Sequence, residues 1–314
     1  MMLSLYDELD ELEGYVSAVA LASGIPVSHV EKDFWVTEAL RGIADASQAT
    51  GCSVIFKGGT SLSKARRLIQ RFSEDVDLLV VLPSGGKKSR DSILKEFAAA
   101  AESKTGLQGT TDASTTTMGV KRTVNLHYPA RFSSVSLKSD VVMEIGSRGG
   151  AIPSTLIKVS SLISEYTASA GLDPDYAENR PVPLLVLDPI RTLVEKLMIL
   201  HNAAEVGDNE RRRKTARHYY DVDALLREPR ILAELEQVRV DVLAREVSQH
   251  SQAVQLSSSD RPSGGFAESS AWGECPDWLV QAYDDVTRRL VWPTAHISTL
   301  EQCCQRVRDH GELL

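Results

Sequence analysis

Residues 57–77 read KGGTSLSKARRLIQRFSEDVD, and this stretch decides both the expected fold and much of the expected chemistry. It follows the apolar run SVIFK at 53–57 and leads into DVDLLVVLP at 75–83. Both apolar runs favour β-strands, and a proline ends the second one. The sequence therefore predicts a strand, a glycine turn, a helix over 60–72, and a second strand that opens on a D-x-D pair.

This order of elements suits a site that handles phosphate. Glycines let backbone N–H groups approach an anion closely, and Thr60 and Ser61 begin the expected helix, whose first turn favours negative charge. Side chains alternate along a strand, so Asp75 and Asp77 share one face with backbones about 7 Å apart. Two such carboxylates can hold Mg²⁺, with Mn²⁺ as an alternative, and the ion can neutralise a triphosphate and activate a hydroxyl.

A third carboxylate from a neighbouring strand would complete this metal site. Glu144 is our candidate because it is a charged residue inside the apolar run VVMEIGS, and Asp140 is the runner-up. In the plain alternative, the D-x-D pair merely begins a strand and Glu144 faces water. The Gly-Gly-Thr-Ser run ahead of the pair argues against that alternative, and the spacing does not fit a Walker A loop.

Composition and charge narrow the class of protein. The chain has 314 residues, is 42% hydrophobic and 25% charged, and carries a formal net charge of −8. We expect a folded protein without a membrane span or signal peptide. The four cysteines form no C-x-x-C pair, so we expect a reducing cytoplasm rather than a disulfide framework or a zinc site. An acidic protein that binds nucleic acid must do so through a local basic patch.

The chain is expected to divide near residue 187 into an α/β domain (1–187) with about five strands and a helical C-terminal domain (188–314). The further strands are expected at 120–128, 139–147 and 182–189, with a short strand or turn and then a helix over 154–170. Residues 105–119 and 251–274 are rich in small polar residues and predict loops. The remaining helices are expected at 3–22, 27–46, 90–104, 189–205, 211–227, 230–248, 276–291 and 295–310.

Three residues in the expected helical domain have more than one possible role. Lys196 lies beside the main apolar stripe of its helix, where it could extend to water or reach a triphosphate. Arg217 and Asp221 are four residues apart on a helix, which alone indicates a surface ion pair.

The run RRRK at 211–214 is the main basic patch. Arg213 and Lys214 lie four and three residues before Arg217, so a continuous helix would gather them in one cluster. The cluster is either a solvated helix face or a contact for RNA phosphates.

The stretch KGGTSLSKARRLIQRFSEDVDLLV resembles the first motif of the nucleotidyltransferase superfamily, and more closely that of the AbiEii toxin nucleotidyltransferases of type IV toxin–antitoxin systems. Three further segments are similar to motifs of that family: EKDFWVTEAL (31–40), EKLMILHN (195–202) and RHYYDVDAL (217–225). The resemblance runs from about residue 30 to residue 226.

The resemblance implies an α/β fold of the DNA-polymerase-β-like nucleotidyltransferase type, a mixed sheet with flanking helices, followed by a helical C-terminal domain. It implies transfer of a nucleotide from an NTP, with pyrimidines and tRNA 3′ ends as the expected case. It also implies a cognate antitoxin of the winged-helix repressor type, encoded next to the toxin.

Each candidate residue then has an expected role. Asp75 and Asp77 would bind metal, with Glu144 as third ligand or base. Lys196 would balance the charge of the triphosphate, and Asp221 would be a structural or catalytic carboxylate near the phosphate-binding Arg217. Arg213 and Lys214 would contact RNA. The nucleotide-binding residues would be Lys57, Gly58, Gly59, Thr60, Ser61 and Ser73, although Lys57 could simply end a strand and Ser73 could be a plain turn residue.

Other functions fit the same residues. The acceptor could be a protein or a small molecule, because fold does not decide the acceptor. A non-catalytic module that senses a nucleotide or docks an antitoxin is a second class, but such a module has no need of both aspartates, the glycines and Lys196.

Overall fold

The computed structural model describes residues 4–73, 75–132, 137, 140–172, 176–252 and 259–314, with the backbone alone at 251–252. The chain forms two compact units. The first comprises Met1–Ala65, Phe72–Val186 and Trp292–Thr294, and the second comprises Arg66–Arg71, Leu187–Val291 and Ala295–Leu314. The segment 66–71, in the middle of the 57–77 stretch, therefore belongs to the second unit.

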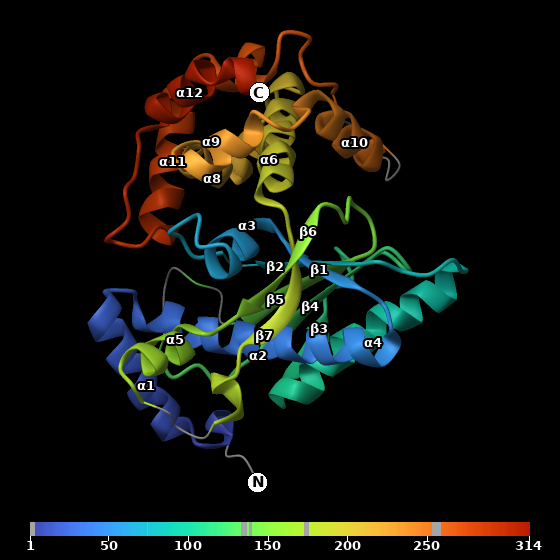
Figure 1. Cartoon of the computed structure of the whole chain (residues 1–314), viewed down its shortest axis with the longest axis vertical. Coiled ribbons are helices and arrows are strands. Elements are labelled where there is room, and N and C mark those ends of the chain that lie inside the picture. Colours follow the sequence, from blue (N-terminus) through green and yellow to red (C-terminus); the bar gives the residue numbers. More distant parts are fainter. Residues whose placement is uncertain (1–3, 74, 133–136, 138–139, 173–175, 253–258) are drawn as a thin grey trace. The chain divides into compact units, whose positions relative to one another are not determined.

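A seven-stranded mixed sheet in the order β3-β4-β5-β2-β1-β7-β6 forms the centre of the first unit (Figure 1). β2 pairs antiparallel with β1 and parallel with β5, β7 pairs parallel with β1, and β3, β4 and β5 are antiparallel. The strands are β1 (Val54–Lys57), β2 (Asp75–Val80), β3 (Gln108–Thr111), β4 (Lys121–His127), β5 (Asp140–Gly146), β6 (Ser154–Val159) and β7 (Val182–Leu187). The mixed sheet with flanking helices confirms the expected fold class.

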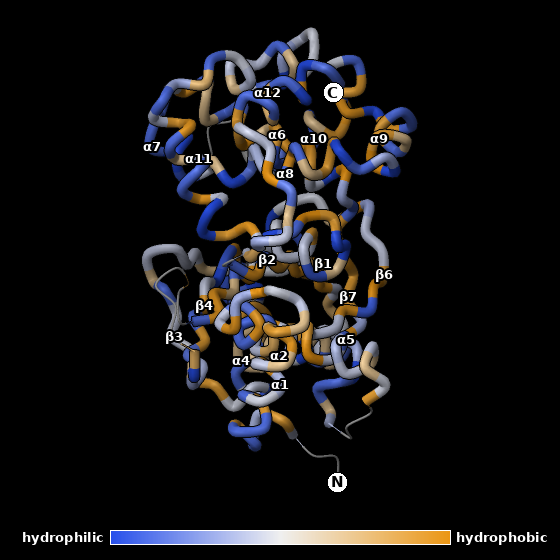
Figure 2. The backbone as a smooth tube through the Cα atoms, turned by 90° about the vertical axis from the view of Figure 1, so that its left-hand side faces the viewer, coloured by the Kyte–Doolittle hydropathy of each residue, from blue (hydrophilic) through white to orange (hydrophobic). Residues whose placement is uncertain are grey.

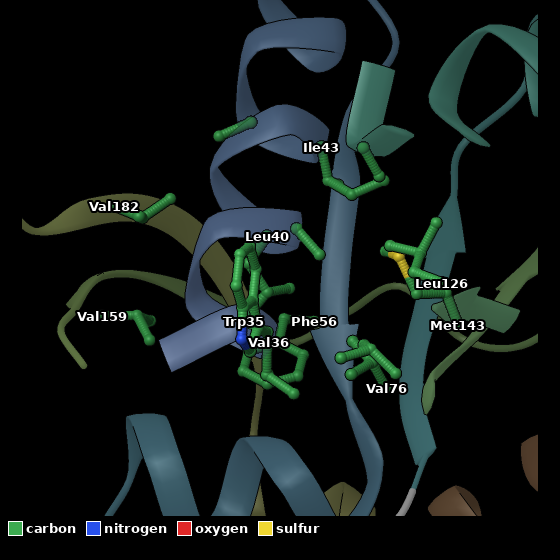
Figure 3. Packing of buried hydrophobic residues seen from close by; sticks show 14 of the residues in the cluster. Trp35, Val36, Leu40, Ile43, Phe56, Val76, Leu126, Met143, Val159 and Val182 are labelled. Carbon is green, nitrogen blue, oxygen red and sulfur yellow. The ribbon is translucent and has the colours of Figure 1, made fainter. Parts of the chain in front are cut away.

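Two long helices cover one face of this sheet. α2 and α4 pack on each other and on strands β1, β4 and β5 (Figure 1). Figure 3 shows the core beneath them, where Leu40 of α2, Phe56 of β1 and Val76 of β2 are each at most 1% exposed. The helices of this unit are α1 (Leu9–Ser23), α2 (Val27–Thr50), α3 (Gly58–Thr60), α4 (Lys87–Thr105) and α5 (Leu162–Ser169), with a π-helical turn η2 (Ser61–Ala65).

The burial of alternate residues along β2 decides where the aspartates lie. Val76, Leu78 and Val80 are buried towards the helices, so Asp75 and Asp77 lie on the opposite face, where both are half-buried. The sheet thus gives the D-x-D pair a rigid base without burying it.

The second unit consists mainly of helices joined by loops. Asp188 caps α6 by accepting a hydrogen bond from the Ile190 amide at 2.8 Å, and Pro189 occupies the first turn, as expected. The helices are α6 (Pro189–Glu205), α7 (Asn209–Thr215), α8 (Arg217–Leu226), α9 (Pro229–Leu235), α10 (Val240–Gln252), α11 (Asp277–Leu290) and α12 (Leu300–Asp309). Within the described part of the chain, no helix combines the length and apolar character needed to cross a membrane.

The expected helix over 60–72 is wrong beyond Ala65. Arg67 adopts a left-handed backbone with φ of 55°, and the Gln70 amide donates to the Tyr220 hydroxyl at 3.3 Å. Contacts within the second unit therefore fix residues 66–71 in an irregular path that helical propensity alone would not produce.

The other differences from the expected elements are two helices that divide and one short strand in an expected loop. The expected helix over 211–227 divides at Ala216, where the Thr215 hydroxyl bonds back to the Arg211 carbonyl oxygen at 2.9 Å, a contact that bends helices. The expected helix over 230–248 divides into α9 and α10, and β3 lies inside the expected loop 105–119. Parts of three predictions lie outside the described residues: Leu3 of the first helix, Ser139 of a strand, and 253–258 of the long loop.

Candidate active site

The glycine turn lies directly against the D-x-D pair. Gly58 follows β1 with φ of +73°, a left-handed conformation that suits glycine. A Cβ added at Gly58 would lie 2.0 Å from Oδ2 of Asp77. The position needs glycine for two reasons, because the backbone is left-handed and because the Asp77 carboxylate occupies the space of a side chain.

The hydroxyls after the turn are used within the protein. Ser61 is fully buried and donates to the Gly58 carbonyl oxygen at 2.9 Å, and buried Thr60 donates to the carbonyl oxygen of Asp75. These two bonds fix the turn and tie it to the start of β2. A phosphate at this turn would therefore find its donors in backbone N–H groups rather than in the two hydroxyls.

Strand register places Glu144 beside the aspartates. Asp77 lies between Lys57 of β1 and Glu144 of β5, and Asp75 lies beside Val142. Paired residues on adjacent strands are about 5 Å apart and share a face, so the three carboxylates occupy one surface of the sheet.

The carboxylate of Glu144 nevertheless points to a cation. Its Oε2 lies 2.7 Å from the Lys121 ammonium, and the two side chains are 33% and 34% exposed. The runner-up Asp140 pairs with His127 at 2.7 Å. Among the residues that the structure describes, no three His, Cys, Asp or Glu side chains form a group ready to hold a metal ion. A metal would therefore rest on Asp75 and Asp77.

Two further candidates flank the pair. Lys57 is half-buried, and its ammonium lies beside the loop after β5, 3.9 Å from an ideal Cβ on Gly149. Ser73 is half-buried two residues before Asp75, and Glu74 between them lies outside the described residues. Both residues lie where β1 ends and β2 begins, and this position is compatible with a nucleotide pocket.

Glu31 and Asp33 of the 31–40 segment bind other parts of the first unit. Glu31 accepts hydrogen bonds from the amides of Arg131 and Phe132 at 2.7 and 3.2 Å. Asp33 pairs with Lys64 of η2 at 2.6 Å, with only 13% of the Asp33 side chain exposed. Phe34 and Trp35, expected to be core residues, are 0% and 2% exposed. The pair between Asp33 and Lys64 therefore attaches this segment to the π-helical turn that follows β1.

In the second unit, Lys196 takes part in a buried network of charges. Its ammonium lies 2.6 Å from Oδ2 of Asp221, which is 0% exposed. Arg71 contacts both oxygens of the same carboxylate, Nε to Oδ1 at 2.6 Å and Nη2 to Oδ2 at 2.8 Å. His218 completes the group, with Nδ1 3.2 Å from the Lys196 ammonium.

The network shifts the pKa values of Lys196, Asp221 and His218. Burial lowers the pKa of Lys196, and the nearby Asp221 only partly opposes the shift. Burial by itself would raise the pKa of Asp221, but Arg71 and Lys196 outweigh it and hold that pKa well below its ordinary value. Burial and then Lys196 lower the pKa of His218 to about 3, so its imidazole is neutral at physiological pH. With Lys196 protonated, two cations share one anion.

The surface-pair interpretation of Arg217 and Asp221 is wrong, because Asp221 is fully buried and directed to Arg71 and Lys196. Arg217 is half-buried in the first turn of α8. Asp223 is also 0% exposed and contacts Arg306 of α12 at 2.7 Å, so it attaches α12 to α8.

The basic patch differs from the expected helical cluster. Lys214 is 73% exposed and pairs with Glu210 at 2.6 Å, which balances its charge locally. The guanidinium groups of Arg212 and Arg213 lie 5.2 and 4.8 Å from the ring centroid of Trp278 on α11, within cation–π distance. The seven residues of α7 are hydrophilic (Figure 2).

Sequence reasoning did not identify Arg71, Lys64 or Trp278. Arg71 carried one signal: it is a charged residue on the apolar stripe of the expected helix, three residues after Leu68 and next to Phe72. A charge in that place indicates a buried partner.

Known proteins share the family and the fold of this chain. No curated protein sequence matches the chain. MenT4, a nucleotidyltransferase toxin of Mycobacterium tuberculosis H37Rv, has a similar fold with a TM-score of 0.60 at 17% identity, covering 96% of this chain and 88% of that one. JHP933 from Helicobacter pylori aligns with a TM-score of 0.43 at 17% identity over 88% of each chain. Residues 39–273 match the family model described as nucleotidyl transferase AbiEii toxin, type IV TA system. This range leaves out most of the 31–40 segment. The chain thus belongs to the AbiEii family of nucleotidyltransferase toxins.

Proposed function

We propose that this toxin adds nucleotides from an NTP, in the expected case a pyrimidine NTP, to the 3′ end of tRNA in a Mg²⁺-dependent reaction that blocks translation and growth. The observation that carries the proposal is the close approach of the Gly58 turn to Asp77, with Asp75 and Glu144 on the same face of the sheet. Family membership implies an NTP substrate and an antitoxin partner. A tRNA acceptor would place the activity in the cytoplasm.

Asp75 and Asp77 fit a divalent ion. Mg²⁺ commonly takes one or two protein carboxylates and completes its shell with substrate phosphates and water, so two aspartates suffice. When bound, the ion would neutralise the triphosphate and lower the pKa of the attacking hydroxyl. The turn after β1 would hold the phosphates through backbone N–H groups, since the hydroxyls of Thr60 and Ser61 are already bonded.

Glu144 is proposed as the base that accepts the proton of the 3′-hydroxyl. It lies beside Asp77, and its pair with Lys121 is one-third exposed, so breaking that pair costs at most about 1 kcal/mol. Lys121 would then be available to a phosphate oxygen. Transfer forms a bond between the 3′ oxygen and the α-phosphorus and breaks the bond to pyrophosphate, which leaves with the negative charge.

The second unit supplies the remaining proposed roles. Lys196 would balance the charge of the triphosphate, with Arg217 near phosphate and Asp221 holding Lys196 in place. Arg213, held against Trp278, would contact acceptor-stem phosphates, with Lys214 as a weaker contributor. The antitoxin is proposed to be a winged-helix repressor encoded beside the toxin.

The decisive experiment incubates the purified protein with total RNA, Mg²⁺ and each α-³²P-labelled NTP in turn. Label at the 3′ end of tRNA supports the proposal, and the preferred NTP identifies the nucleotide. Label on protein indicates protein nucleotidylation instead, and label on small molecules indicates a metabolite acceptor. No label with any NTP indicates a binding module. Asp77→Asn, which retains the shape of the side chain, is the matched inactive control.

A further inference from the structure

We propose that Cys275 and Cys304 form a disulfide when the protein reacts with a peroxide, so that the second unit carries a site of oxidative modification. The observation that carries the proposal is the contact between the two sulfur atoms, whose Sγ–Sγ distance is 3.6 Å. Both cysteines belong to the second unit, and both are free thiols in the structure. The inference does not depend on the proposed function.

The two adjacent cysteines of α12 have different partners. The buried residues of this helix follow the spacing of one apolar face: Leu300, Cys303, Cys304 and Val307. From that face Cys304 reaches Cys275, whereas Cys303 contacts the hydroxyl of Tyr283 at 3.4 Å. Cys304 is therefore the partner of Cys275, although Cys303 adjoins it in the sequence.

Contacts within the second unit hold the two thiols near each other. The pair between Arg306 and Asp223 attaches α12 to α8. Arg308 of α12 donates to the carbonyl oxygen of Trp272, three residues before Cys275. The segment between Trp272 and α11 is neither helix nor strand. A disulfide needs an S–S distance of about 2.05 Å, and this segment can supply the approach while α12 stays in place.

Exposure and acidity both make Cys275 the thiol that reacts first. All four cysteines lie in the described part of the chain, and Cys275 is half-buried while the other three are at most 7% exposed. Burial raises the pKa of Cys275, and a hydrogen bond from Cys304 opposes the shift. Burial also raises the pKa of Cys304, and there the neighbouring Cys275 adds to the shift. Cys275 thus ionises more readily, and the thiolate is the reacting form.

Oxidation of the pair by hydrogen peroxide takes two steps. The Cys275 thiolate attacks one oxygen of the peroxide, the O–O bond breaks, and a sulfenic acid forms at Cys275 as hydroxide leaves. The Cys304 thiolate then attacks the sulfenic sulfur, the S–S bond forms, and the S–O bond breaks as a second hydroxide leaves. The hydroxides take up the two thiol protons. Two thiols are thereby oxidised to one disulfide, and the peroxide is reduced to two molecules of water.

The disulfide joins two segments that are 29 residues apart in the chain. It connects α12 with the start of α11, where Trp278 lies against Arg212 and Arg213. Closing a loop of this length restricts the unfolded chain, so the oxidised protein resists urea more than the reduced protein does. The competing explanation is that the two side chains are packed as small apolar groups, and it predicts no bond between them.

The test treats the folded, reduced chain with hydrogen peroxide and then counts thiols in urea with a maleimide reagent. The wild type should go from four thiols to two while it remains a single chain on a non-reducing gel, and dithiothreitol should restore all four. Its urea midpoint should rise by about 1 M on oxidation. A different thiol count, or a cross-link between two chains, would refute the proposal.

The adjacent cysteine supplies a matched control. Cys303→Ser should keep the cross-link, go from three thiols to one, and show the wild-type rise in urea midpoint. Cys304→Ser should form no disulfide and show no rise. The reverse pattern in these two variants would assign the bond to Cys303. Where a variant at a buried position does not fold, Cys275→Ser at the half-buried position decides, because any disulfide formed in it would exclude the proposed pair.

Discussion

At the scale of single residues, Gly58 brings the glycine turn against Asp77 of the proposed metal-binding pair. Gly58 and Gly51 have nearly the same backbone, with φ of +73° and +68°. A Cβ on Gly51 would meet nothing within 4 Å, whereas one on Gly58 would meet the Asp77 carboxylate at 2.0 Å. The two glycines therefore separate backbone strain from displacement of Asp77.

We expect Gly58→Ala and Gly51→Ala to lose similar stability, about 1 kcal/mol each from the left-handed backbone. Only Gly58→Ala should lose nucleotide transfer, by about a hundredfold or more, because it pushes Asp77 away. Urea denaturation and the labelling assay measure the two effects. Equal activity in both variants would show that the position of Asp77 does not matter.

His29 makes the first unit sensitive to acid. Burial, and then the charge of Lys32, lower its pKa to about 4, and its ring stacks on Phe72 at 4.8 Å. A lowered histidine pKa means that the unfolded chain takes up a proton near pH 6.5 that the folded chain refuses down to about pH 4. The folded state therefore loses stability as pH falls through this window.

We expect the wild type to lose roughly 1–2 kcal/mol of unfolding free energy between pH 7.5 and pH 5.0 from His29. His29→Phe keeps the stacking and should remove most of this loss, whereas His250→Gln at an exposed site on α10 should not. Urea unfolding curves at the two pH values test this. An unchanged pH dependence in His29→Phe would assign the acid sensitivity to other groups.

At the scale of helices and strands, the sequence predicted how the candidate carboxylates of the first unit are placed on the sheet. Alternation along β2 correctly placed Asp75 and Asp77 on one face, because strand geometry is local. The irregular path of 66–71 was not predictable in the same way. It depends on Asp221 and Tyr220, about 150 residues away in the chain, and no local pattern reports such a partner.

The surroundings of the basic residues of α7 were also not predictable from the local sequence, in which these residues looked equivalent. Glu210 pairs with Lys214, and Trp278 lies far along the chain in α11, so the structure separates a locally balanced lysine from guanidinium groups held on an aromatic ring. This difference changes which residue we expect to contact RNA.

Arg213→Gln should raise the RNA concentration for half-maximal transfer severalfold and lower the slope of its salt dependence by about one. Lys214→Gln should have a smaller effect, because Glu210 already balances its charge. Arg288→Gln, an exposed arginine on α11 paired with Asp285, makes the same change in net charge and serves as the control. If all three variants share the wild-type salt slope, the RNA path lies on another surface.

At the scale of the whole molecule, the two units are not two consecutive pieces of chain. The second unit includes Arg66–Arg71 as well as Leu187–Val291 and Ala295–Leu314. That short segment contributes Leu68 and Ile69, which are 8% and 2% exposed, together with the fork from Arg71 to Asp221. The expected C-terminal domain, 188–314, therefore lacks a segment of the second unit that carries buried side chains.

We expect a fragment of residues 188–314 to be much less stable than the same helices in the full chain. Losing two buried aliphatic side chains removes about 3–5 kcal/mol of burial, and the loss of Arg71 deprives Asp221 of two hydrogen bonds. Circular dichroism during urea unfolding of the fragment and the full chain measures this. Adding a peptide of residues 64–73 should restore part of the helical signal, and the same peptide with Arg71→Gln should restore less. A fragment that unfolds cooperatively at the urea midpoint of the full chain would show that the helices form a complete domain without residues 66–71.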